Sequence, residues 1–282
     1  MNPGALWPAF ALPAELCGAL WRLGWKLGRA LKLRRDRALV HGLASEIAAD
    51  PASAKIVRVG SLLVGGGGRT TVARALARLL SEEGIRTALL CFDRKLGAEP
   101  ARVDAGASFV PGGFGDDALL LARSGVPAFA SGDMLRAAAR LRTGFEVLVL
   151  DGGLEDPRLD PLPGIETVVL RPLGRRAPRT FAELLPFGRN RSFESDHRGA
   201  RFWTTGPRPS PAVARAGDRE SEPDVEFGIV PPPRPGERIR LVTGVGNPRG
   251  AARLLRAAGA EVAELRVARD HSAGSIRRAV AR

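Results

Sequence analysis

The chain has 282 residues, of which 44% are hydrophobic and 26% charged, a balance that is typical of a globular protein and excludes a largely disordered one. Its net charge of +13 favours anionic partners, but no zinc-ligand spacing, RNA motif or helix-turn-helix signature is present, so nucleic acid is not an expected partner. Two cysteines, Cys17 and Cys91, exclude a disulfide framework and fit a reducing compartment.

The first 45 residues are predicted to form an amphipathic, membrane-associated helix. Residues 3–21 carry one charge, Glu15, and the positive residues follow this apolar stretch, whereas a secretory signal would carry them before it. Pro8 and Pro13 interrupt the stretch, which is marginal in length for a spanning helix. We therefore expect a helix that lies on a membrane rather than one that crosses it.

From Pro13 onward the apolar and basic residues separate onto different faces of this helix. The apolar face carries Leu16, Leu20, Leu23, Leu27 and Leu31 at spacings of three and four. Another face carries Arg22, Lys26 and Arg29, with Trp21 and Trp25 towards it at the depth of lipid headgroups. This pattern predicts binding to an anionic membrane surface; the alternative is a helix packed on the domain with its basic face in solvent.

Residues 55–93 are predicted to form a strand, a glycine-rich turn, a helix and a second strand. Four successive glycines, Gly65, Gly66, Gly67 and Gly68, would let backbone N–H groups approach a phosphate at the helix N-terminus. Arg69 stands where the general phosphate-loop pattern has lysine, and Leu63 replaces its first glycine. Thr70 stands where a hydroxyl would meet Mg²⁺, and Thr71 follows it. The alternative is a turn that binds nothing.

A second acidic signal lies in FEVLVLDGGLED, where β-forming residues lead directly into Asp151. An acidic residue at the carboxyl end of a buried strand is where nucleotide enzymes hold Mg²⁺. The alternative is an ordinary turn aspartate.

The last third of the chain contains a proline-rich segment and a second strand–helix–strand unit. Residues 201–238 are rich in Pro and charge and are predicted to be a linker. Residues 239–267 contain Gly244 and Gly246, a weak dinucleotide signal because Gly250 is displaced from the third glycine position.

Several motifs in order give the chain a resemblance to a known family. After the N-terminal helix they are GSLLVGGGGRTT (60–71), GDDA (115–118), DGGLED (151–156), LPFGRNRS (185–192), GVGNP (244–248) and DHS (270–272). From about residue 1 to 275 the chain resembles the tetraacyldisaccharide 4′-kinases, the lipid A kinases of Gram-negative bacteria.

The resemblance implies transfer of the γ-phosphoryl group of ATP, with Mg²⁺, to the 4′-hydroxyl of the lipid A disaccharide precursor at the cytoplasmic face of the bacterial inner membrane. It implies that the four glycines, Arg69, Thr70 and Thr71 bind ATP, and that Thr70 and Asp151 hold Mg²⁺. It implies that Asp116 is the base, with His271 as its partner. Arg191 matches an arginine of the LPAGPLRE motif and would contact the acceptor.

The chain departs from the family pattern at several of these positions. Arg69 replaces lysine, Gly152 replaces the second aspartate of DDG, Glu155 and Asp156 replace Gln-His, and Ala118 replaces the proline of GDEP. Losing one charge that stabilises a transition state commonly costs on the order of 10² to 10³ in rate. Two rival functions therefore stay open: a catalytically impaired homologue that binds nucleotide or lipid, and a soluble P-loop enzyme with another acceptor.

The predicted fold is α/β, with a P-loop-type, mainly parallel sheet flanked by helices, an N-terminal membrane-associated helix and a small C-terminal α/β lobe. The predicted division is 1–45 for the helix, 46–200 for the kinase domain, 201–238 for the linker and 239–282 for the lobe. Asp116 and His271 are expected to face each other across a cleft. The sequence leaves the oligomeric state open.

Overall fold

The computed structural model describes residues 7–50, 53–63, 67–107, 113–172, 177–185, 190–206, 225–226, 233–243 and 248–267. Contacts group the chain into two compact units. The first comprises Met1–Leu62, Gly68–Val169 and Pro178–Arg201, and the second comprises Leu63–Gly67, Leu170–Ala177 and Phe202–Arg282. The four-part division expected from the sequence stays a prediction.

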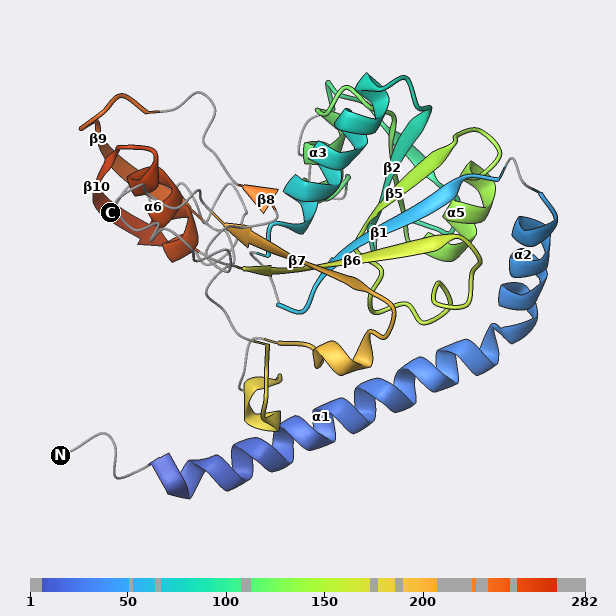
Figure 1. Cartoon of the computed structure of the whole chain (residues 1–282), viewed down its shortest axis with the longest axis horizontal. Helices are drawn as coiled ribbons and strands as arrows, with labels where there is room; N and C mark the ends of the chain where they lie inside the picture. The colour runs from blue at the N-terminus through green and yellow to red at the C-terminus, as the bar shows by residue number, and fades with distance from the viewer. Residues whose placement is uncertain are drawn as a thin grey trace, which may run out of the picture. The chain divides into compact units, whose positions relative to one another are not determined.

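The larger sheet has eight strands in the order β3-β4-β2-β5-β1-β6-β7-β8 (Figure 1). The strands are β1 (Lys55–Ser61), β2 (Thr87–Phe92), β3 (Ala101–Val103), β4 (Ala128–Ser131), β5 (Val147–Asp151), β6 (Ile165–Pro172), β7 (Arg201–Gly206) and β8 (Val225–Glu226). The central strands β4, β2, β5 and β1 pair in parallel, and only β3 runs antiparallel to its neighbour β4 among these pairs. The predicted α/β class with a mainly parallel sheet is confirmed.

Successive side chains of the central strands point to opposite faces of the sheet, as the pleat of a strand requires. Leu90, Leu148 and Leu150 belong to a buried cluster with α5 (Met134–Leu141) and α2 (Arg37–Ala49). Leu89 and Val149 alternate with them, are also fully buried, and so point to the opposite face. There α3 (Arg69–Glu82) packs on β1, β2 and β5 through Val72, Ala73 and Ala77. Apolar strands covered on both faces explain the continuous hydrophobic runs of the sequence.

The helix α1 (Trp7–Arg35) is one long element that leads into α2 after a bend (Figure 1). It continues through Pro13, which therefore does not interrupt it. It lies along the 3₁₀ helix η2 (Phe181–Glu183), and a side chain at Gly18 would collide with the Phe181 carbonyl. Glu15 accepts a hydrogen bond of 2.8 Å from the Phe181 backbone N–H.

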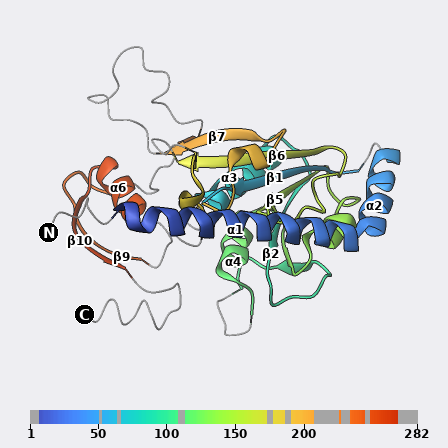
Figure 2. The same cartoon turned by 90° about the horizontal axis from the view of Figure 1, so that it is seen from below.

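The apolar face of α1 is turned away from the rest of the first unit. The five leucines of the predicted stripe are 56–65% exposed, although a helix that packs on a core buries its apolar face. They are Leu16, Leu20, Leu23, Leu27 and Leu31. Figure 2 shows α1 running alongside the other elements of this unit.

The basic face of α1 lies against the protein, whereas the alternative expected from the sequence placed it in solvent. Arg22 and Lys26 pair with Asp196 at 2.6 and 3.2 Å, and Arg29 pairs with Asp160. Lys32 pairs with Asp156 at 3.1 Å. The basic side chains are therefore paired within the protein, although the Lys26 side chain stays 51% exposed, because acidic residues distant in sequence collect beneath the helix.

The two tryptophans follow the basic face. The indole N–H of Trp21 donates to the Arg191 carbonyl at 3.2 Å, and the guanidinium of Arg29 stacks over Trp25 at 4.7 Å. Both indoles thus contact the protein, Trp21 stays 38% exposed, and the placement of the indoles at the depth of lipid headgroups stays a prediction.

Residues near the C-terminus form a small parallel pair of strands with one helix. These are β9 (Arg238–Thr243), α6 (Pro248–Ala257) and β10 (Glu261–Val267). The predicted C-terminal strand–helix–strand unit is confirmed. Among the described helices, none is long and apolar enough to cross a membrane.

Candidate active site

Asp151 lies at the carboxyl end of β5, in the centre of the parallel sheet. Its register partners are Val59 of β1 and Cys91 of β2, so the residue is flanked by strands on both sides. It is 1% exposed. Its two carboxylate oxygens are engaged by different partners: Arg69 donates to Oδ1, and the Thr70 hydroxyl donates to Oδ2 at 2.7 Å. A buried carboxylate held in this way is fixed in orientation.

Arg69 and Thr70 open α3, the helix that follows β1. Gly68 precedes them with a φ of 75°, a left-handed conformation that favours glycine, and its carbonyl accepts the Val72 N–H at 3.0 Å. Thr71 is the next residue of α3 and is exposed. The start of the helix therefore faces the end of β5, as a phosphate loop requires.

Asp117 joins this cluster. Its carboxylate accepts a hydrogen bond of 3.2 Å from Thr70 and lies 3.6 Å from an Arg69 nitrogen. Burial raises the pKa of the Asp117 carboxyl, and the neighbouring Asp151 carboxylate adds to the rise. The structure thus brings together Arg69, Thr70 and Asp151 as expected, with Asp117 as a member that the sequence analysis did not place there.

Asp116 lines a cavity of about 480 Å³ beside the cluster. It is the first residue of α4 (Asp116–Ala122) and shares the cavity with Asp117, Lys95 and Asp93. A cavity of this size admits a small polar ligand.

Asp93 shapes this cavity and was missed by the sequence analysis. Its carboxylate accepts the Gly115 N–H at 2.8 Å and the Lys95 N–H at 3.1 Å, so it fixes the loop that carries α4. A side chain at Gly115 would stand 3.4 Å from the same carboxylate. Asp93 follows β2 as Asp151 ends β5, and this shared signal of an acid at a strand end was available in the sequence.

Arg191 lies close enough to Arg69 for their charges to interact. Its guanidinium pairs with Glu155, and its backbone N–H donates to the Leu62 carbonyl at 2.8 Å. Burial lowers the pKa of Arg191, and the charge of Arg69 lowers it further. Arg191, which the resemblance implies would contact the acceptor, therefore lies near the Arg69 cluster. It is paired with Glu155, one of the residues that depart from the family pattern.

The Arg69 guanidinium lies beside the place that a side chain at Gly152 would take, which links two of those departures. Gly152 has a φ of 108°, and an added Cβ would stand 3.3 Å from an Arg69 Nη and 3.4 Å from its Cζ. The guanidinium thus occupies the space that a side chain at position 152 would need.

Oxygen donors at the cluster are of the type that Mg²⁺ prefers. The Thr70 hydroxyl lies between the carboxylates of Asp151 and Asp117, at 2.7 and 3.2 Å. Arg69 engages one oxygen of Asp151, and the described residues contain no group of three or more His, Cys, Asp or Glu side chains arranged as a metal site. The donor chemistry fits a hard divalent cation, and the assignment of Mg²⁺ to Thr70 and Asp151 stays a prediction.

Three predicted elements lie outside the described residues: Gly65 and Gly66, His271, and most of the GVGNP motif. The expected apposition of Asp116 and His271 therefore also stays a prediction.

Comparison with known proteins identifies relatives along nearly the whole chain. The family model described as tetraacyldisaccharide-1-P 4′-kinase matches residues 17–278. A tetraacyldisaccharide 4′-kinase of Halorhodospira halophila is 31% identical over 98% of this chain and 81% of its own length. One of Anaeromyxobacter dehalogenans strain 2CP-C is 32% identical over 96% of this chain and 75% of its own length.

A similar solved structure is that of LpxK from Aquifex aeolicus, described as an apo form in complex with ATP. It is 19% identical, with a TM-score of 0.47, over 89% of this chain and 82% of that one.

Proposed function

Because the chain belongs to the tetraacyldisaccharide-1-P 4′-kinase family, we propose that it phosphorylates the 4′-hydroxyl of tetraacyldisaccharide 1-phosphate with ATP in lipid A biosynthesis. The observation that carries this proposal is the cluster of Arg69, Thr70, Asp117 and Asp151 at the junction of α3 and β5. The cluster places a cation, a hydroxyl and carboxylates at the start of a helix, where the protein positions and neutralises phosphoryl groups.

In the proposed reaction the 4′-oxygen forms a bond to the γ-phosphorus, and the bond to the β–γ bridging oxygen breaks to release ADP. Asp116 takes the proton of the 4′-hydroxyl, and His271 orients that carboxylate. The exposed position of Asp116 at the cavity supports this role, since the base must reach an incoming substrate.

The phosphates of ATP rest on backbone N–H groups of Gly65, Gly66, Gly67 and Gly68 in this proposal. Arg69, Thr70 and Thr71 complete the ATP site, and Arg69 neutralises charge on the transferring group. Mg²⁺, held by Thr70 and Asp151, would supply further neutralisation of the phosphate oxygens. Arg191 contacts the acceptor.

We further propose that the protein binds peripherally to the cytoplasmic face of the bacterial inner membrane through the outer face of α1. The support is the exposed leucine stripe, a contiguous apolar face that α1 does not bury within its own unit. Because the cations of the opposite face are paired within the protein, apolar insertion contributes more to this binding than those cations do.

Vesicle co-sedimentation tests the membrane proposal. Leu23→Ser combined with Leu27→Ser should reduce binding to anionic vesicles at both low and high salt, since the lost contribution is apolar. Leu79→Ser, on α3, removes an equally exposed leucine outside the stripe and is the control. Equal binding by all three proteins would contradict the proposal.

The enzymatic proposal is tested with radiolabelled ATP, Mg²⁺ and tetraacyldisaccharide 1-phosphate in mixed micelles. We expect product from the native chain and at least a 10²-fold lower rate from Asp116→Asn, with ATP affinity retained. ATP binding without product in the native chain would favour the impaired homologue. Transfer to a soluble acceptor alone would favour the other P-loop enzyme.

A further inference from the structure

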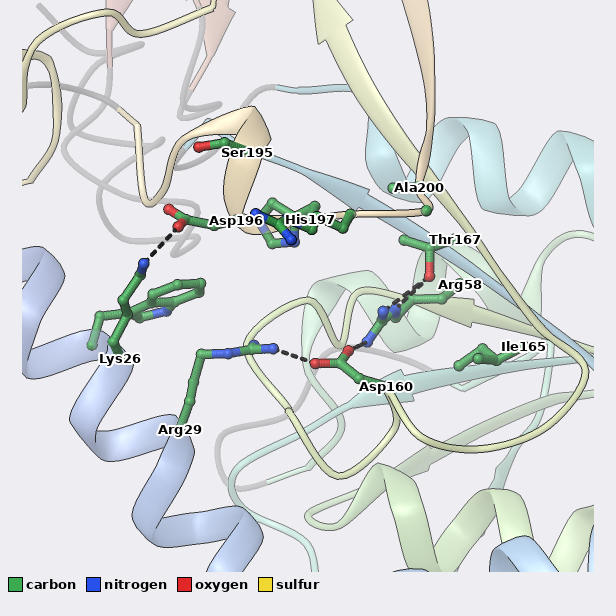
Figure 3. A pocket seen from close by; sticks show the side chains of 13 residues that line it. Lys26, Arg29, Arg58, Asp160, Ile165, Thr167, Ser195, Asp196, His197 and Ala200 are labelled. Carbon is green, nitrogen blue, oxygen red and sulfur yellow. Dashed lines mark hydrogen bonds and ion pairs between the residues drawn. The ribbon is translucent and has the colours of Figure 1, made fainter.

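A second cavity, of about 620 Å³, lies on the inner side of α1 (Figure 3). It is bounded by α1, by β1 and β6, and by residues 195–200, which include the end of the 3₁₀ helix η3 (Glu194–Asp196). None of its lining residues lines the Asp116 cavity. The proposed phosphoryl transfer uses none of them, so the cavity has no part in the function described above.

Positive side chains outnumber carboxylates around this cavity. Arg29 and Arg58 share one carboxylate, Asp160, and the Arg58 contact measures 2.9 Å. Arg22 and Lys26 likewise share Asp196. These ion pairs contain four positive side chains and two carboxylates, so the paired groups carry an excess of two positive charges.

One of the positive groups is fixed in place before any ligand arrives. Arg58 is 5% exposed, and its guanidinium donates to the Thr167 hydroxyl at 2.9 and 3.1 Å and to the Gly153 carbonyl at 3.2 Å. Figure 3 shows Arg58 and Arg29 directed at Asp160 from opposite elements. A buried and oriented guanidinium loses little entropy when it binds an anion.

His197 lines the same cavity and lies within reach of its positive charges. Its Nε2 lies 2.8 Å from the Ser192 hydroxyl, and its ring stands edge-on to Trp25 at 6.1 Å. Burial lowers the pKa of His197 to about 4, and the charges of Arg29 and Arg58 contribute to this shift. The part of the shift that comes from Arg29 and Arg58 shows that their positive charges act inside the cavity, where they favour a negative group.

The mouth of the cavity carries one further cation, Arg198, beside Lys26. Lys26 and Arg198 line the cavity and are exposed, so both can move toward a ligand without leaving a buried position. Hydroxyl groups of Ser195 and Thr167 also line it. Arginine, lysine and hydroxyl donors together are the groups that bind phosphate oxygens.

We propose that this cavity is a second ligand site, which binds a phosphate monoester carried by a small polar group. The cavity is larger than a phosphate ion alone needs, and the indole of Trp25 supplies apolar surface for the attached carbon skeleton. The phosphate belongs either to a soluble ester or to the headgroup of a lipid, since the same donors bind both.

Trp25 provides the readout for a binding test on the full chain. Glycerol 3-phosphate is titrated while tryptophan fluorescence is recorded, and we expect a saturable change that Trp25→Phe abolishes. The Arg69→Gln variant should keep the change, which separates this cavity from the glycine loop. No saturable change in the native chain would overturn the proposal.

Substitutions at the mouth test which side chains bind. Lys26→Gln combined with Arg198→Gln should weaken binding of glycerol 3-phosphate about 5- to 10-fold, because charge-assisted hydrogen bonds are lost. Arg78→Gln removes an exposed cation on α3 and should leave the affinity unchanged. Equal affinities in the native and doubly substituted proteins would overturn the proposal.

A competition experiment identifies the source of the phosphate. Vesicles of phosphatidylcholine with phosphatidic acid are added to the complex with glycerol 3-phosphate, and vesicles of phosphatidylcholine alone are the control. Displacement by the phosphatidic acid vesicles alone supports a lipid headgroup as the ligand. Binding of glycerol 3-phosphate without such displacement supports a soluble ester.

Discussion

Gly152→Ala adds one methyl group and tests whether the absence of a side chain at position 152, beside the Arg69 guanidinium, matters to catalysis. The added Cβ would meet the guanidinium at 3.3–3.4 Å, closer than most side-chain contacts, so Arg69 must move by a few tenths of an ångström. That movement disturbs its contact with Asp151. Misplacement of a group that stabilises the transition state costs on the order of 10² in rate.

The same substitution also strains the backbone, and the two effects need to be separated. An alanine at a φ of 108° costs about 1–3 kcal/mol in the free energy of unfolding. Gly125→Ala is a matched control, because Gly125 has a φ of 82° and nothing within 4 Å of an added Cβ. It should lose stability of similar size and keep its rate of phosphoryl transfer.

Thermal unfolding and kcat are measured for both variants, and Arg69→Lys is then added to Gly152→Ala. Lysine has no Nη groups at the point of contact, so the rate effects of the two changes should be non-additive. The reasoning would be refuted if Gly152→Ala retained the native kcat, or if the two alanine variants behaved alike in both assays.

Three further outcomes follow from buried groups. The pKa of His197 is depressed from 6.5 to about 4, so the unfolded chain binds more protons between these values and the free energy of unfolding should fall by about 3 kcal/mol as pH drops from 7 to 4. His197→Gln should flatten this part of a stability-versus-pH curve, and an unchanged curve would contradict the assignment. Arg158 is 4% exposed and lies within 2.7–2.9 Å of three carboxylates. Arg158→Leu should lower the free energy of unfolding by about 3–5 kcal/mol, measured by denaturant unfolding. A loss below about 1 kcal/mol would show that the carboxylates find other partners. Burial and the Asp151 carboxylate raise the pKa of Cys91, so a thiol reagent at pH 8 should label Cys17 first, and faster labelling of Cys91 would indicate local opening.

Local pattern was enough to predict the elements that form the frame of the site. The β-rich run before the glycines, the helix after them and the strand that ends at Asp151 all appear where hydrophobic periodicity placed them. A parallel sheet brings the carboxyl ends of its strands to one edge, so Arg69, Thr70 and Asp151 were expected to meet, and they do.

Side-chain direction across elements was decided by the tertiary structure. Sequence spacing grouped Asp116 with Asp117, but only the turn that begins α4 determines that Asp117 reaches Thr70. The Arg69 guanidinium lies beside the place of a side chain at Gly152, 83 positions away in the chain, and no local pattern encodes this proximity.

The orientation of α1 shows the same division most clearly. Spacing by itself determined that the leucines share one face and the cations another, because an α-helix repeats every 3.6 residues. It did not determine which face meets the protein. That depends on Asp160 and Asp196, which come from distant parts of the chain and gather beneath the helix only after folding. The cations of the charged face are thereby paired within the molecule, and the leucine face is the one left exposed.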